Sequence, residues 1–139
     1  MQTFLPYKDL RLSAKTLDNK RCFKQAVECI QILNVLGNSN RRGWVNHPAV
    51  RMWRGHESTL VTYLDYLLQE WKSRGYKSPK CDQHLKRLVL EFGVSSQLPH
   101  WLNDEFCKRH RSNLLRKDET FYRKYGWSEP TTLEYLWPI

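Results

Sequence analysis

The sequence predicts an all-α protein: a compact single-domain helical bundle of about four helices, followed by an irregular, aromatic-rich C-terminal tail. Three observations support this fold class. Apolar residues recur at steps of three and four, no long alternating run indicates strands, and no internal repeat or compositionally simple segment is present. Because 139 residues suit one domain, we expect residues 1–139 to fold as a single unit.

The first helix is expected from about Ser13 to Leu36. Its apolar stripe consists of Leu17, Ala26, Val27, Ile30, Leu33 and Leu36. Ser13 is placed to cap this helix and Gly37 to end it. The opposite face concentrates charge, in Lys15, Lys20, Arg21, Lys24 and Glu28. This face is the first candidate functional surface.

The second helix is expected to begin near Asn46-His47-Pro48, where a polar residue precedes a proline suited to the first turn, and to end at Gly75. Its buried stripe consists of Leu60, Tyr63, Leu64, Leu67, Leu68 and Trp71. The spacing predicts two more helices, from about Asp82 to Phe92 and from about Asp104 to Arg116. The aromatic-rich tail then runs from Asp118 to Ile139.

A strong positive charge points to a polyanionic partner. Lys and Arg number 23 against 14 Asp and Glu, which gives a formal net charge of +9 and a pI of about 9.6. A basic soluble protein without such a partner remains an alternative. No apolar run approaches the roughly 20 residues of a spanning helix, and the N-terminus lacks the order of a signal peptide. We therefore expect a soluble, cytoplasmic protein with no membrane partner.

No motif in the sequence indicates a cofactor or a metal. The four cysteines are widely spaced without a CxxC pair, which favours reduced thiols over a zinc site or a disulfide framework. P-loop, dinucleotide, HExxH and GxSxG patterns do not occur. Three basic, aromatic-bearing clusters remain, at residues 17–28, 44–55 and 110–118, and they supply phosphate ligands, stacking surfaces and a few acids and bases.

Glu28 is the carboxylate of the first cluster, and two interpretations of it stand side by side. Neighbouring cations favour the ionised form of a carboxylate, which could then stabilise a developing positive charge. Alternatively, Glu28 and Lys24 lie four residues apart and could form an ordinary intrahelical ion pair, worth about 0.3–0.5 kcal/mol.

The second cluster leaves similar alternatives. His47, directly before a proline at a helix start, could cap the helix, bind phosphate when protonated, or act in catalysis. Trp53 could belong to the core, or it could stack on a base because Arg51 and Arg54 flank it.

Several motifs together resemble one known family. They are Gln2-Thr3-Phe4-Leu5-Pro6-Tyr7, Leu17-Asp18-Asn19-Lys20-Arg21 with Lys24, Gln25 and Glu28, Asn46-His47-Pro48-Ala49 with Met52-Trp53, Glu70-Trp71 with Arg74-Gly75-Tyr76, residues 110–118 and Trp137-Pro138. This set is similar to the pyrimidine-dimer DNA glycosylases of the phage endonuclease V type, in a distant phage and bacterial branch. The likeness extends over nearly the whole chain.

The resemblance implies a mechanism. In this family the N-terminal α-amino group attacks the sugar C1′, releases the base and leaves an imine, which undergoes strand cleavage by elimination. An α-amine has a pKa of about 7.7–8.0, against about 10.4 for a lysine, so more of it is nucleophilic at neutral pH. A glutamate on the first long helix assists, and the matching residue is Glu28. Glu28 lies seven residues after Arg21, and the family often has a histidine at the Arg21 position.

The N-terminus departs from the family pattern, in which a small second residue is exposed once Met is removed. Here Gln2 follows Met1, and we expect its side chain to discourage that removal. The nucleophile is then the Met1 amine, a lysine such as Lys20 or Lys24, or absent.

The resemblance implies a DNA glycosylase, with or without abasic-site lyase activity, that acts as a monomer on duplex DNA containing a damaged or modified pyrimidine. The expected catalytic residues are Glu28, Met1, Arg21 and Lys24. The expected DNA-binding residues are Lys20, His47, Arg51, Trp53, Arg54, His110, Arg111 and Lys117. Two alternatives stay open: a non-catalytic protein that binds nucleic acid or a host factor with the same fold, and an enzyme acting on a free nucleotide.

Overall fold

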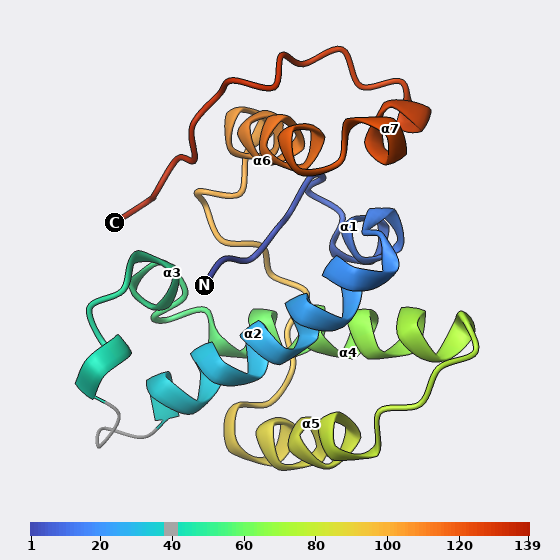
Figure 1. The fold of residues 1–139 in the computed structure, drawn as a ribbon. Coiled ribbons are helices and arrows are strands. Elements are labelled where there is room, and N and C mark those ends of the chain that lie inside the picture. Colours follow the sequence, from blue (N-terminus) through green and yellow to red (C-terminus); the bar gives the residue numbers. More distant parts are fainter. Residues whose placement is uncertain (38–41) are drawn as a thin grey trace.

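A computed structural model of the chain describes residues 1–37 and 42–139. Within these residues the regular structure is entirely helical, which confirms the all-α prediction (Figure 1). The four long helices expected from the sequence are present as α2, α4, α5 and α6. The short helices α1, α3 and α7 bring the described total to seven, three more than expected.

The first expected helix is in fact two helices. Helix α1 spans Leu10–Thr16 and α2 spans Asn19–Gly37. Between them Leu17 is extended and fully buried, so the chain bends in order to place this side chain in the core. Asp9 caps α1 by accepting a backbone N–H of its first turn. The expected cap, Ser13, is wrong, because its hydroxyl bonds the backbone of the preceding loop instead.

The second expected helix is also divided. A 3₁₀ turn at Arg42–Trp44 leads to α3, Pro48–Arg51, and α4 follows at Glu57–Ser73. His47 caps α3 by accepting the Ala49 N–H at 3.0 Å, as one of its interpretations predicted. The helix does not continue through Gly55, whose φ of 86° is a left-handed conformation that interrupts the helical path.

The remaining helices lie close to their predicted positions. Helix α5 spans Pro79–Phe92 and α6 spans Asp104–Lys117. The tail begins with α7, Glu119–Tyr122, and a 3₁₀ turn at Arg123–Tyr125. It then runs back along α6, held by bonds such as Ser112 Oγ to Pro130 O and Asn113 Nδ2 to Leu133 O, and ends on the side of α3 (Figure 1).

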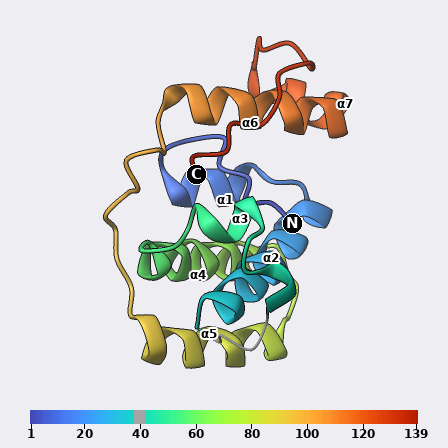
Figure 2. The ribbon, with the colours of Figure 1, turned by 90° about the vertical axis from the view of Figure 1, so that its left-hand side faces the viewer.

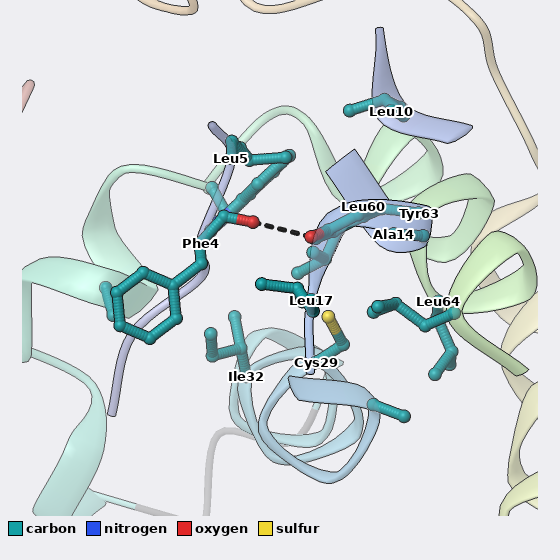
Figure 3. Packing of buried hydrophobic residues seen from close by; sticks show 14 of the residues in the cluster. Phe4, Leu5, Leu10, Ala14, Leu17, Cys29, Ile32, Leu60, Tyr63 and Leu64 are labelled. Atoms are coloured by element: carbon teal, nitrogen blue, oxygen red, sulfur yellow. Dashed lines mark hydrogen bonds between the residues drawn. The ribbon is translucent and has the colours of Figure 1, made fainter. Parts of the chain in front are cut away.

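The helices form layers around a shared core. Helix α2 packs on α4, and α4 also contacts α1 and α5. Helices α6 and α7 lie on the side of α2 and α4 that is opposite α5 (Figure 2). The N-terminal residues 1–6 pass between α6 and the α2–α4 layer (Figure 1). The Tyr63 hydroxyl of α4 donates to Phe4 O at 2.5 Å within this core (Figure 3). Among the described residues no helix has the length and apolar character needed to cross a membrane.

Candidate functional site: a basic pocket at the N-terminus

A pocket of about 350 Å³ lies where the N-terminal segment, α2, the end of α6 and the C-terminal tail meet. Four cations line it: Lys20, Arg21, Lys24 and Lys117. The first three lie along one face of α2 because Lys24 is four residues after Lys20 and three after Arg21. Lys117 comes from the last turn of α6. The structure thus brings together cations that are nearly 100 residues apart in sequence.

Lys117 is affected by the neighbouring positive charges of the pocket. Partial burial first, and then the charges of Arg21 and Lys24, lowers the pKa of Lys117 below its ordinary value. Like charges gathered in this way repel one another unless an anion neutralises them. The pocket is therefore suited to a negatively charged ligand.

Glu28 is the acidic residue of the pocket, and it contacts the N-terminal segment. Its Oε2 accepts the Gln2 backbone N–H at 3.3 Å, which places the carboxylate one residue from the Met1 amine. Within the described part of the chain no salt bridge joins Glu28 to Lys24, so the structure does not form the ordinary ion pair considered for them. A second pocket of about 290 Å³ shares Met1 and Glu28 and has Trp44 in its lining.

Buried side chains fix the N-terminal segment in this position. Gln25 of α2 donates from Nε2 to Gln2 O at 2.8 Å and accepts the Phe4 N–H on Oε1 at 2.6 Å. Trp53 Nε1 donates to Thr3 Oγ1 at 2.9 Å. These bonds leave little freedom for the backbone beside Glu28, so the distance between the amine and the carboxylate is set by the fold.

Aromatic rings form another side of the pocket. Phe4, Tyr135 and Trp137 line it, and the ring of His47 lies 6.2 Å from Trp137 and 5.8 Å from Trp44. Partial burial, followed by the charge of the N-terminal amine, lowers the pKa of His47 below 6.5. The charge of the N-terminal amine thus acts on His47, which also caps α3.

Sequence reasoning did not select Gln2, Gln25, Tyr135 or Trp137 as site residues. The aromatic richness of the tail was visible, but nothing in the spacing showed that the tail returns to α2.

All three of the expected DNA-binding arginines lie away from this lining. Arg51 and Arg54 are exposed on and just after α3, apart from the described lining of the pocket. Arg111 is half-buried and serves the fold: its Nε donates to Glu129 at 3.1 Å and its Nη1 donates to Pro6 O at 2.8 Å. Its guanidinium thus joins the N-terminal segment to the C-terminal tail.

Two expected DNA contacts require correction. Trp53 is fully buried, and its ring packs edge-on against Trp101 at 5.1 Å, so it offers no face to a base. His110 is also buried, where its Nδ1 accepts the Leu5 N–H at 3.2 Å and its ring stacks on Phe106. Burial lowers the pKa of His110 to about 3, so it is a neutral acceptor and not a cation for phosphate. Both residues are structural.

The fold and the site together define a small, basic, all-helical protein with an anion-attracting pocket built around one carboxylate and the chain's N-terminus. A sequence model described as pyrimidine dimer DNA glycosylase matches residues 1–84. The chain belongs to this family, and this assignment supports a DNA glycosylase function with DNA as the partner. A search of the curated proteins and a search of the solved structures each return no match.

The matched range carries only part of the pocket. Met1, the three cations of α2 and Glu28 fall within residues 1–84. Lys117, Tyr135 and Trp137 lie beyond it. The far side of the pocket is therefore described by the structure alone.

Proposed function

We propose that this chain excises a damaged or modified pyrimidine from duplex DNA, with the basic pocket as its active site. One observation carries the proposal: the Glu28 carboxylate lies in a cation-lined pocket and accepts the backbone N–H next to the Met1 amine. An acid, an amine and phosphate ligands are the groups that base excision by this family requires. A pocket completed by segments from both ends of residues 1–139 supports their action as one domain, and we propose that this domain acts as a monomer.

The cations bind the DNA backbone. Lys and Arg neutralise phosphates, and each contact releases condensed counterions, so binding is strong and sensitive to salt. Lys20, Lys24 and Lys117 hold the phosphates beside the target nucleotide, and the exposed Arg51 and Arg54 extend the contact along the duplex. With a net charge of +9 the whole protein is attracted to DNA before the pocket engages.

Glu28 stabilises the positive charge that develops on the sugar as the base leaves. A fixed carboxylate in a partly dehydrated pocket acts more strongly than one in water, and it needs no rearrangement during the reaction. The bond from the Gln2 N–H holds the carboxylate close to the attacking group.

The Met1 α-amine is the nucleophile of the proposed reaction. Its lone pair forms a bond to C1′, the C1′–N bond breaks, and the electron pair of that bond leaves with the pyrimidine, which takes up a proton. The amine then loses a proton and the ring oxygen gains one as the sugar opens to an imine. Loss of a C2′ proton expels the 3′ phosphate and cleaves the strand. Glu28 bonds the backbone N–H of the adjacent residue, Gln2, and shares the pocket lining with Met1, which favours Met1 for this role over Lys20 or Lys24.

Extrusion of a nucleotide from the stack costs a few kcal/mol, which aromatic contacts can offset. Since Trp53 is buried, this role passes to the rings at the pocket: Tyr135 and Trp137 on its lining and Trp44, which is 50% exposed, in the adjoining pocket.

The test is cleavage of the C1′–N bond by Glu28→Gln on a duplex carrying a thymine dimer. The cleaved pyrimidine stays joined to its neighbour through the dimer, so base release is measured as free thymine after photoreversal of the dimer. We expect release to fall by about 100-fold or more, the usual contribution of a preorganised electrostatic group, while duplex affinity stays at or above that of the wild type. Glu105→Gln is the matched control, because Glu105 is an exposed residue of α6 and its loss changes the net charge equally. Release by Glu28→Gln at the wild-type rate would contradict the assignment.

A further inference from the structure

Arg21 is held in a fixed position, in contrast to the exposed lysines of the pocket. Its Nη1 donates to both carboxylate oxygens of Asp18, each at 3.2 Å. The two side chains are 17% and 14% exposed, so this ion pair is largely shielded from water. Arg21 therefore enters the pocket with its guanidinium already oriented, while its Nε and Nη2 keep their donors available for a ligand.

Asp18 is itself fixed by a residue from the far end of the chain. The Tyr122 hydroxyl of α7 donates to Asp18 Oδ1 and accepts the Asp18 backbone N–H at 3.1 Å. Tyr122 is fully buried, and its ring stacks on Trp127 at 5.5 Å with an angle of 4° between the planes. Burial raises the pKa of Tyr122 well above its ordinary value, so the hydroxyl keeps its proton and remains a donor.

This arrangement has a physical purpose in a pocket crowded with cations. Repulsion from Lys24 and Lys117 would push an unrestrained arginine toward solvent, and ordering its long side chain at the moment of binding would cost entropy. Asp18 counters the repulsion, and Tyr122 fixes Asp18, so the ordering is complete before DNA arrives.

We propose that Asp18 and Tyr122 are positioning residues, which orient Arg21 to bind a phosphate of the target strand beside the extruded nucleotide. The inference rests on the proposed function of the pocket. It gives α7, which lies outside the family-matched range and outside the pocket lining, a part in binding the substrate.

The first test is a double-mutant cycle on affinity. The probe is a duplex with a tetrahydrofuran abasic analogue, which cannot form an imine. Tyr122→Phe keeps the stacked ring and removes the hydroxyl, and we expect it to weaken binding about fivefold, the value of one hydrogen bond. In the Arg21→Gln background the same change should have no further effect, since the residue being oriented is gone. Additive losses would show general damage to the fold and overturn the proposal, as would unchanged affinity in Tyr122→Phe.

Tyr125→Phe is the matched control. Its hydroxyl donates to Thr16 O at 3.0 Å, so the variant loses one hydrogen bond from the neighbouring turn without touching Asp18. We expect wild-type affinity.

A second variant tests whether DNA affinity rises or falls, and its result does not depend on how well Tyr122→Phe folds. Asp18→Asn raises the net charge from +9 to +10, so simple electrostatics predicts tighter binding to DNA. Loss of the oriented guanidinium predicts weaker binding. Tighter binding with an unchanged rate of base release would overturn the positioning role.

These outcomes separate the two proposals. If the wild type releases base and the variants behave like it, only the positioning role fails. If the wild type binds the probe and releases no base from any pyrimidine lesion, the proposed reaction fails while the affinity cycle still decides the role of Asp18 and Tyr122. A wild type that binds no duplex would overturn both.

Discussion

Replacement of Gln25 by leucine should detach the N-terminal segment from α2. Gln25 is 1% exposed, and its side chain provides both a donor to Gln2 O and an acceptor for the Phe4 N–H. Leucine has a similar volume but neither group, so the variant leaves two buried backbone groups without these partners. The residues that present the Met1 amine to Glu28 then lose their strongest attachment to the helix.

The magnitude follows from these contacts. An unsatisfied buried backbone group costs about 1–3 kcal/mol, so the two together cost roughly 2–6 kcal/mol. Apolar contact made by the leucine offsets about 1 kcal/mol of this. We expect the free energy of unfolding to fall by about 3 kcal/mol, which is a decrease of about 1.5 M in the urea midpoint at an m-value near 2 kcal/mol/M.

Urea denaturation followed by circular dichroism measures the effect, with Gln83→Leu as the matched control because Gln83 is exposed on α5. Base release by the folded Gln25→Leu protein should fall as well, since the amine is no longer fixed near the carboxylate. A change in midpoint below about 0.3 M, with normal base release, would refute the reasoning that Gln25 holds the segment.

Three further predictions concern single side chains. Burial holds the pKa of His110 at about 3, below its ordinary 6.5. The stability contributed by the neutral imidazole is therefore complete above pH 6.5 and is lost as the pH falls toward 3. The urea midpoint should drop between pH 7 and pH 4.5, and by less in His110→Gln. Trp53→Phe removes the donor to Thr3 Oγ1 and should lower the free energy of unfolding by about 1–3 kcal/mol without changing duplex affinity. Weaker duplex binding by the folded variant would show that Trp53 contacts DNA after all. Lys24→Gln should reduce the slope of log affinity against log salt by about one, as expected when one phosphate contact is lost, and an unchanged slope would place Lys24 outside the interface.

Much of the pocket could be predicted because it lies on one helix. Helical spacing alone places Lys20, Arg21, Lys24 and Glu28 on one face of α2, and the charge pattern marked that face in the sequence. The apolar periodicity also located the four long helices. Where side chains meet through local spacing, the sequence is sufficient.

The sequence did not predict the positions of residues that are placed by tertiary contacts. Apolar periodicity continues across Leu17, so it did not show that the chain bends there to bury that side chain. Trp53 between two arginines suggested exposure, but its partners are Thr3 and Trp101, each about 50 residues away. The return of Trp137 to the pocket depends on side-chain bonds from α6 to tail carbonyls, which leave no periodic pattern.

The most direct test of the account is to trap the covalent intermediate. The protein is incubated with duplexes carrying a thymine dimer or an abasic site, borohydride is added to reduce any imine, and mass spectrometry maps the attachment point. We predict cleavage of the C1′–N bond at the dimer and a reduced adduct on the Met1 α-amine, both strongly diminished in Glu28→Gln. Duplex binding without an adduct or base release, or an adduct confined to a lysine, would contradict it.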